Sequence, residues 1–276
     1  MIGELWTLCA LKIGATVIGQ VVEQEAPDDI QDILGADSGE VYPRGSSIAL
    51  EDPRFRVTTQ AVKTALATVG LTGVALSAEA PAQLFFQKHA QGGTRTAAAC
   101  HAIQLTAGVA FWSSLDADQN GAAVDLEVIG TTPDGTNAPQ TVLDDQAIPT
   151  FAAPELYVAG GSAAGVQSIR IDTGIAPVAL QGDGEAWNSI VSIDRIVPRV
   201  VVRQTKWVDL GPTTLASVAL TDCAQGGYRG SSPITFTFNQ IQAVARRVGG
   251  RPSLIEIEGL ATYNGTNAPI LITGLT

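Results

Sequence analysis

Basic side chains, aromatic rings, histidine and cysteine are all scarce in this 276-residue chain. Sixteen Lys and Arg stand against twenty-seven Asp and Glu, and the resulting formal charge of −11 disfavours binding to nucleic-acid phosphates or anionic lipid. Aromatic residues make up 5% of the chain, too few to favour base stacking or a sugar-binding surface. The three cysteines, Cys9, Cys100 and Cys223, are widely spaced and form no CxxC pair. They predict reduced thiols, with neither a disulfide framework nor a thiolate zinc site.

The sequence contains two histidines for acid–base chemistry, His89 and His101. A Ser-His-Asp or Cys-His site needs a histidine held between a nucleophile and an orienting acid. His101 directly follows Cys100, so on a strand their side chains point to opposite faces. No P-loop, nucleophile elbow or HExxH motif occurs in the sequence. We therefore expect no enzymatic activity, no catalytic residue and no cofactor, and interpret both histidines as structural.

The apolar start of the chain does not read as a targeting or membrane segment. The stretch from Met1 to Gly19 lacks a basic region and is interrupted by Glu4 and Lys12, unlike a signal peptide. No run reaches the roughly 18 uncharged apolar residues of a membrane helix. We expect a protein made in the cytoplasm, with no membrane partner.

Hydrophobic residues are 45% of the chain and charged residues 16%, so the chain can bury a core. Its length corresponds to about two ordinary domains. Twenty-nine Gly and fourteen Pro interrupt the chain often, and Val, Ile and Thr fill the intervening runs. This composition predicts a mostly β protein.

The chain contains an internal repeat. Residues 38–57, SGEVYPRGSSIALEDPRFRV, align without gaps on residues 183–202, DGEAWNSIVSIDRIVPRVVV. Further on, HAQGGTR at 89–95 matches CAQGGYR at 223–229, and DGTNAP at 134–139 matches NGTNAP at 264–269. Three matches in the same order predict a tandem duplication, with domains at 1–150 and 151–276. The boundary falls in the Pro- and Ala-rich stretch from Asp144 to Glu155.

Alternation of apolar and polar residues predicts strands in both halves. The run VDLEV places Asp125 and Glu127 on one face, and the run LIEIE places Glu256 and Glu258 on one face. This period of two predicts a sheet that is packed on one side only. Predicted strands lie at 11–23, 98–111, 122–132, 168–174, 197–204, 234–240 and 254–262.

Turns and one helix complete the predicted fold. The pairs Asn120-Gly121, Asp134-Gly135 and Asn264-Gly265 predict tight hairpin turns. A helix is predicted at 58–70, where apolar residues recur at helical spacing and Gly70 ends the run. The expected fold class is all-β: a tandem duplication of a β-sandwich or barrel domain, each copy with a short helix.

One motif has the spacing of a calcium-binding loop. Asp116, Asp118, Asn120, Gly121 and Glu127 fit the template D-x-[DN]-x-[DN]-G-x5-E, in which alternate oxygens surround the ion. Such a loop lies between two helices, whereas the residues after Gly121 alternate like a strand. The second half has RRVGGRPSLIEIE here, which keeps a glycine turn without the oxygen ligands. We interpret the motif as a hairpin turn and keep a calcium site as the alternative.

The segment 165–202 resembles the tail tube, or major tail, proteins of long-tailed bacteriophages. The shared pattern is a strand of the form SxxxDxG, a loop, and an aromatic-bearing strand that ends in a D-R-x-P-like turn. The stretches 11–39 and 85–95 have a similar character, so the resemblance covers about half the chain. The residues that carry the pattern are Ser168, Asp172, Gly174, Trp187, Asp194, Arg195 and Pro198.

The resemblance implies a structural virion protein that forms stacked rings around a DNA-conducting channel. Some family members fuse two tube domains, so that three subunits make a pseudo-sixfold ring, and a duplicated chain is similar to these. The implied partners are further copies of the chain, other tail proteins and passing viral DNA, which is not recognised by sequence. The implied location is the virion tail, after assembly in the host cytoplasm. Closing such a ring needs heterologous contacts between the first half of one subunit and the second half of the next.

The resemblance also suggests roles for particular residues. In the family, strands of all domains join into an inner barrel whose bore is commonly acidic, which makes Asp125, Glu127, Glu256 and Glu258 the channel-lining candidates. The alternative for these carboxylates is an ordinary solvated face. A long loop between early strands reaches the adjacent ring, and the loops at 27–44 and 176–188 are the corresponding candidates. The inter-ring candidates are Asp37, Glu40, Tyr42, Asp183, Glu185 and Trp187.

Other functions stay open at this point. A distal tail or baseplate hub ring protein would reuse the same domain type. From a different class, a carbohydrate-binding or adhesin β-sandwich module fits the β-rich composition, although aromatics are scarce. A calcium-dependent hydrolase is the enzymatic alternative.

Overall fold

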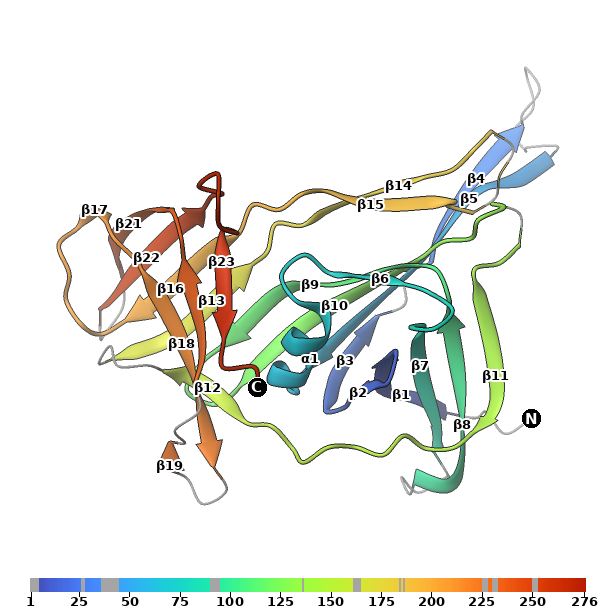
Figure 1. Ribbon diagram of the computed structural model, residues 1–276, viewed down its shortest axis with the longest axis horizontal. Coiled ribbons are helices and arrows are strands. Elements are labelled where there is room, and N and C mark those ends of the chain that lie inside the picture. The colour runs from blue at the N-terminus through green and yellow to red at the C-terminus, as the bar shows by residue number, and fades with distance from the viewer. Residues whose placement is uncertain are drawn as a thin grey trace.

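The computed structural model describes residues 5–25, 28–35, 45–89, 95–135, 137–160, 165–183, 185, 187–224, 228–229, 233–249 and 253–276. Within these ranges the protein is mostly β, with several antiparallel sheets and one short helix, α1 (Val62–Val69) (Figure 1). No helix in this part of the chain is long and apolar enough to cross a membrane. None of the three cysteines forms a disulfide, and Cys9 and Cys100 are buried.

A long central sheet runs through both halves of the chain. Its strands follow the order β17 (Gly211–Thr213), β21 (Ile241–Val248), β22 (Leu254–Ala261), β16 (Arg199–Gln204), β13 (Val166–Asp172), β9 (Gly108–Ala117), β10 (Ala122–Gly130), β5 (Gly45–Thr59) and β3 (Val21–Glu25). Two further strands join it: β4 (Asp28–Gly35) pairs with β5, and β6 (Val74–Leu76) pairs with β9.

A smaller sheet accompanies each half, and one hairpin stands apart. The first-half sheet has the order β11 (Gln140–Gln146), β8 (Arg95–Leu105), β7 (Ala82–His89), β1 (Leu5–Ile13) and β2 (Thr16–Ile18). The second-half sheet has the order β12 (Tyr157–Gly160), β18 (Ser217–Ala224), β20 (Ile234–Phe238) and β23 (Ile270–Thr273), with β19 (Tyr228–Arg229) on β18. The hairpin consists of β14 (Ala176–Leu180) and β15 (Ile190–Arg195).

The strand pairings of the two halves follow the same order. In the first half β1, β7, β8 and β11 are neighbours in one sheet, and β3, β5, β10, β9 and β6 are neighbours in the other. In the second half β12, β18, β20 and β23 are neighbours, and β13, β16, β22, β21 and β17 are neighbours. Each half also has a hairpin arm, β4–β5 in the first and β14–β15 in the second, and both arms extend toward the same end of the molecule (Figure 1).

The two halves meet where β9 pairs antiparallel with β13. The paired residues run from Ile169 opposite Ala117 to Asp172 opposite Ser114. This pairing makes the central sheet continuous, because backbone N–H and C=O groups at the inner edge of each half are satisfied by the other half.

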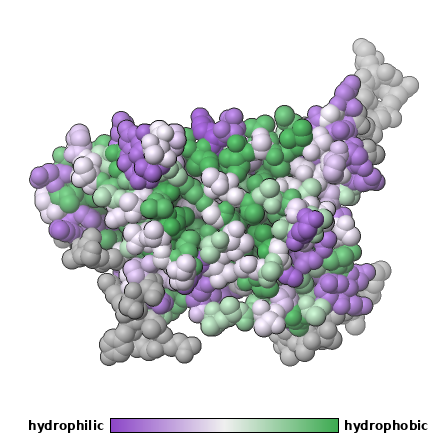
Figure 2. Space-filling model, in the orientation of Figure 1, coloured by the Kyte–Doolittle hydropathy of each residue, from purple (hydrophilic) through white to green (hydrophobic). Residues whose placement is uncertain are grey.

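One hydrophobic core fills the space between the central sheet and the two smaller sheets. Trp112 is fully buried, its indole Nε1 donates to the carbonyl of Gly70 at 2.9 Å, and its ring lies 6.4 Å from that of Phe236 in the second half. Figure 2 shows hydrophobic residues gathered across the middle of the visible face, with hydrophilic residues toward both ends. Members from both halves include Leu11, Val57, Leu84, Leu115, Leu126, Ile171, Val202, Leu220 and Ile234.

The segment between the halves holds the start of α1. Ala61, at the N-cap position, gives the helix no side-chain cap. Glu155, just before β12, supplies one: its carboxylate accepts hydrogen bonds from the backbone N–H of Lys63 at 2.6 Å and of Thr64 at 3.0 Å. Its own backbone is fixed by the Gln20 side chain, which donates at 3.0 Å and accepts at 2.8 Å. A carboxylate at this place stabilises the helix in two ways: it satisfies N–H groups that have no partner within the helix, and its negative charge interacts favourably with the helix dipole.

Several sequence-based expectations need correction. A second short helix is absent from the described part of the second half: the segment after β16 is extended, since Gly211 has a φ of 107° and Pro212 lacks an N–H. The predicted strand at 11–23 is three strands, broken at Gly14 and Gln20, which both have positive φ. The predicted strand at 98–111 spans β8 and β9, which belong to different sheets.

The predicted turns divide into two kinds. Asn120-Gly121 joins β9 to β10, which pair antiparallel, so this hairpin is confirmed. The hairpin prediction is wrong for Asp134-Gly135 and Asn264-Gly265, which lead from the central sheet into a smaller sheet. Both glycines have positive φ, as a tight turn requires, but a local turn does not decide which sheet the next strand joins.

We expect Glu155→Ala to lower the free energy of unfolding by about 1–2 kcal/mol, because it removes the cap of α1. Urea denaturation of the full chain measures the change. Glu79→Gln, at an exposed site before β7, is the matched control and should leave stability unchanged. Equal stability of the Glu155→Ala variant and the parent would contradict the capping role.

Candidate functional site: the charged face of the central sheet

The central sheet has a charged face, defined here as the side turned away from the hydrophobic core. Along β10 the apolar residues Val124 and Leu126 point into the core, and Asp125 and Glu127 therefore point the other way. The same alternation repeats on β5, β13, β16, β21 and β22. The charged face carries Glu23, Arg54, Arg56, Asp116, Asp125, Glu127, Arg170, Asp172, Arg199, Arg203, Arg246, Glu256 and Glu258.

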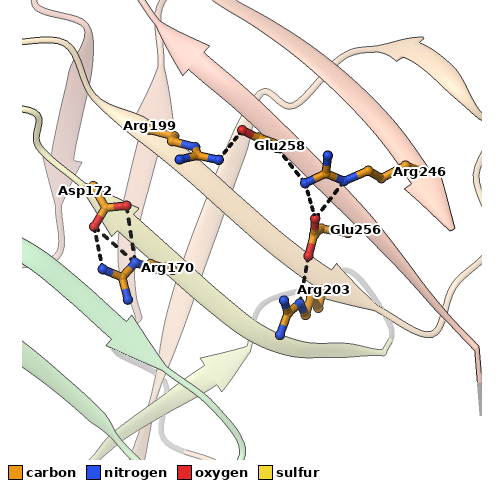
Figure 3. Close-up of polar contacts among 7 residues, drawn as sticks. All are labelled: Arg170, Asp172, Arg199, Arg203, Arg246, Glu256 and Glu258. Carbon is orange, nitrogen blue, oxygen red and sulfur yellow. Dashed lines mark hydrogen bonds and ion pairs between the residues drawn. The ribbon is translucent and has the colours of Figure 1, made fainter. Parts of the chain in front are cut away.

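In the second half, Glu256 lies between two arginines from neighbouring strands (Figure 3). Arg203 Nε donates to one carboxylate oxygen at 2.9 Å, and Arg246 Nη2 donates to the other at 2.6 Å. Arg246 also reaches Glu258 at 2.8 Å, and Arg199 forms a further ion pair with Glu258. The strand register explains the cluster, because Glu256 stands directly opposite Arg203 on one side and Arg246 on the other.

Burial and pairing act in opposite directions on Glu256. The residue is 5% exposed, and burial alone would raise the pKa of its carboxyl group. Hydrogen bonds from Arg203 and Arg246 outweigh burial, so the pKa of Glu256 lies below its ordinary value. The same contacts raise the pKa of Arg246. Glu256 and Arg246 therefore both carry their charge at neutral pH.

In the first half, the corresponding carboxylates have different partners. Glu127 is 8% exposed and lies 3.5 Å from Arg56 and 3.8 Å from Arg54. Asp125 accepts hydrogen bonds from the hydroxyl groups of Thr58 and Ser114, both at 2.6 Å. The first half thus holds one carboxylate with guanidinium groups and the other with neutral hydroxyls.

An arginine bridges the two halves across the β9–β13 junction. Arg170 on β13 contacts Asp116 on β9 at 3.3 Å and Asp172 on its own strand at 3.0 Å (Figure 3 shows the Asp172 contact). Burial raises the pKa of Asp116, as do the nearby carboxylates of Asp125 and Asp172, and Arg170 only partly offsets them. An open polar hollow of about 550 Å³ lies over this junction.

The four channel-lining candidates, Asp125, Glu127, Glu256 and Glu258, all lie on the charged face, as their alternation predicts. They are not free carboxylates, because each accepts hydrogen bonds or forms ion pairs. Sequence reasoning missed the arginines that accompany them. One signal was available: Arg54 and Arg199 coincide in the internal repeat and occupy equivalent places opposite Ile129 and Leu260. The role of the face as a channel lining stays a prediction.

The inter-ring candidates fall in two places. Asp37, Glu40 and Tyr42 lie outside the described residues. Asp183, Glu185 and Trp187 lie in the turn between β14 and β15, and this turn contacts the first half of the same chain. The Trp187 backbone N–H donates to the Gly135 carbonyl at 3.0 Å, and the Asn188 carbonyl accepts from Thr132 at 3.0 Å.

The predicted loops are partly strands. Within the candidate loop at 27–44, residues 28–35 form β4, and within the loop at 176–188, residues 176–180 form β14. These segments pair along the length of β5 and β15, so backbone hydrogen bonds hold them as extended arms. The loop prediction failed because neither run has the clear alternation of a half-buried strand: residues 28–35 mix apolar and acidic residues irregularly, and residues 176–180 are all apolar.

The calcium candidates do not share one site. Asp118 accepts hydrogen bonds from the backbone N–H groups of Asn120 at 2.6 Å and Gly121 at 3.1 Å, which lower its pKa. Asp116 faces Arg170, and Glu127 faces Arg54 and Arg56. Across the described ranges, no group of three or more His, Cys, Asp or Glu is placed to hold a metal ion.

His101 contacts an acidic residue and an aromatic ring. His101 Nδ1 lies 2.7 Å from Asp144, and its ring centroid lies 4.4 Å from that of Trp6. Cys100 faces the other side of the strand and is buried in a small apolar cluster with Cys9 and Phe85. The arrangement matches the expectation that Cys100 and His101 point apart.

We expect Glu256→Gln to lower stability near neutral pH by about 1–3 kcal/mol, because it removes charge-assisted hydrogen bonds from a buried site. Since the folded-state pKa of Glu256 lies below its ordinary value of 4.5, its contribution is present above that value. The contribution is lost as pH falls below 4.5 and through the folded-state pKa, so the stabilities of the parent and the variant should converge over that acidic range. Chemical denaturation at each pH measures this. A difference that is independent of pH, or no larger than that of Glu79→Gln, would contradict the ion-pair account.

Calcium should leave the melting temperature unchanged, since the candidate ligands are occupied by arginines and by turn N–H groups. A ligand that binds only the native state must raise the melting temperature. The measurement compares thermal unfolding in millimolar calcium with unfolding in chelator. A calcium-dependent rise that disappears in Asp118→Asn would contradict this reading and restore the metal site.

The charged face is an extended polar surface that both halves of the chain build together. Its carboxylates and guanidinium groups neutralise one another over most of its length. No protein-family model and no curated protein matches this chain. The function is therefore inferred from this geometry and from the sequence pattern.

Proposed function

We propose that this protein is a structural subunit of a bacteriophage tail tube. In this proposal the chain is a tandem duplication of one β domain, and three chains close into a pseudo-sixfold ring. Stacked rings then enclose a channel through which viral DNA passes. The protein performs no reaction and acts as a rigid conduit.

The identical order of strand pairing in the two halves supports the duplication. With β2, α1 and β19 set aside, each half has four strands in its smaller sheet, five in its part of the central sheet and one hairpin arm, connected in the same sequence. The register agrees as well: Leu126 stands opposite Val57, and Ile257 stands opposite Val202. Val57 and Val202 are the residues that coincide in the internal sequence repeat.

The observation that carries the ring proposal is the pairing of β9 with β13. It joins the first half to the second edge to edge, head to tail, and uses a different strand from each half. A heterologous contact of this kind either closes into a ring or continues as an open filament. One chain already joins two similar units by this contact. Three chains joined by the same contact would therefore supply the six units of a closed ring.

The charged face suits the wall of a DNA channel. Its arginines are held by carboxylates, so they do not form a patch that would grip phosphates. The ionised groups keep the surface hydrated, and the chain as a whole is acidic. DNA would slide along such a wall without adhering to it.

Cryo-electron microscopy of the concentrated protein, and of virions that contain it, tests the proposal. We expect end-on views of stacked rings with three chains, six similar β units and an open bore lined by the charged face. A single ring confined to the tail tip would instead favour the distal tail or baseplate hub alternative. A closed dimer without a bore, and absent from virion tails, would contradict the proposal.

A further inference from the structure

Three contacts at the junction between the two halves involve the β9 edge, the face beside it and the turn after β10. The first is the pairing of β9 with β13. In the second, Ile175, Val191 and Ile193 of the β14–β15 arm cover Val109, Phe111 and Ile129 on β9 and β10. In the third, the turn after β14 meets the Asp134-Gly135 turn through the Trp187 backbone N–H.

The second half has the same receiving surface, and it is uncovered. Phe111 stands opposite Glu127, and Val244 stands opposite Glu258 at the equivalent place. Ile129 stands opposite Arg54, and Leu260 stands opposite Arg199. Phe111 and Ile129 are 1% and 0% exposed, whereas Val244 and Leu260 are 52% and 48% exposed. The difference is the arm that covers the first pair.

The edge and the turn show the same contrast. On β9, residues 108–110 pair with β6 and residues 114–117 pair with β13. On β21, residues 243–245 pair with β17, while residues 246–248 have a described strand partner only on the β22 side. The Asn264-Gly265 turn is exposed, and the neighbouring Tyr263 is 62% exposed.

The first half carries the complementary pieces. Strand β3 occupies the same place in its half as β13 does in the second, and its only described strand partner is β5. Both strands also have an irregularity at the same register position, before Glu23 and before Ser168. The β4–β5 arm corresponds to the β14–β15 arm and extends from the body (Figure 1).

The charges of these two ends are opposite. The segment from Val21 to Gly35 contains Glu23, Glu25, Asp28, Asp29 and Asp32 and no Lys or Arg. The segment from Ile241 to Arg251 contains Arg246, Arg247 and Arg251 and no Asp or Glu. The internal junction likewise joins opposite charges, Arg170 and Asp116, at 3.3 Å. Arg246 is already paired with Glu256 and Glu258, so Arg247 and Arg251 are the basic residues of this segment whose charge favours contact with the acidic segment of another copy.

We infer that the uncovered surface of the second half receives the first half of another copy of this chain, by repeating the internal junction. Strand β3 of that copy pairs antiparallel with the 246–248 end of β21. Its β4–β5 arm lies over Val244 and Leu260 and removes both from water. The inference rests on the proposed function, because it names the contact through which the ring would close.

Photocrosslinking tests the contact directly. A benzophenone amino acid replaces Val244, and the labelled chain is mixed with chain enriched in 15N, so that mass spectrometry separates intermolecular from intramolecular products. We expect intermolecular cross-links to peptides within residues 28–59. The same substitution at Leu271, which is 53% exposed on β23, is the matched control and should give none to this segment.

A variant provides a second test. Val244→Asp places a charge beneath the arm, and we expect the concentration needed for half-assembly to rise by about tenfold or more. Leu271→Asp should leave assembly unchanged. Because Val244 is exposed in the single chain, thermal unfolding of the monomer should not change, which separates loss of contact from loss of fold.

The outcomes distinguish this inference from the proposed function. Rings whose cross-links from position 244 map to another segment would overturn the contact and leave the tube. Cross-links to residues 28–59 in open chains without a bore would support the contact and contradict the proposed tail-tube function. A chain that stays monomeric at every concentration, or assembles equally well with Val244→Asp, would overturn the inference.

Discussion

Backbone pairing between β9 and β13 is the contact on which the rest of the structure depends. It satisfies the hydrogen-bonding groups of two inner strand edges and makes one sheet from two halves. The core follows from it, because a continuous sheet presents one apolar side on which both smaller sheets pack. Joining the inner edges also leaves two outer ones: β3 at one end, and at the other the 246–248 end of β21, beyond the three residues that pair with β17. Open edges are sites at which a further strand can add.

On the opposite side of that sheet, the charged face, ion pairs offset the cost of covering carboxylates. Its strands bring carboxylates and guanidinium groups into register, so Glu127 and Glu256 are nearly covered and still form ion pairs with arginines. A buried carboxylate without partners would be costly, and the arginines offset that cost while keeping their own side chains about half exposed. The charge excess of the chain therefore lies elsewhere, in part along the acidic segment from Val21 to Gly35.

Most of the fold follows from sequence patterns that act locally. Alternation identified β10, β13, β16, β20 and β22, and helical spacing identified α1. The internal repeat aligns Val57 with Val202, and Asp125 and Glu256 stand at the same register position relative to these valines, as do Glu127 and Glu258. These features could be predicted because a period of two or 3.6 is set by neighbours in the chain.

What the sequence did not reveal depends on neighbours in space. The turn at Asp134-Gly135 was predicted as a hairpin, but its residues fix only the local backbone and not the sheet that β11 joins. The partners of Glu256 come from β16 and β21, and no local pattern gives the register of three strands. Glu155 caps a helix that lies far away in the chain. Residues 28–35 and 176–180 were predicted as parts of loops because neither run alternates, and their strand pairing depends on partners elsewhere, β5 and β15.

Amide hydrogen exchange tests the central claim most directly, which is that the outer edges of the central sheet join as the inner edges do. In the monomer, peptides that contain β9 and β13 should be protected, and peptides that contain β3 and the end of β21 should exchange quickly. After assembly, peptides that contain β3 and the end of β21 should be as strongly protected from exchange as those that contain β9 and β13. Protection that appears on other strands, with β3 and β21 unchanged in the assembled protein, would contradict the account.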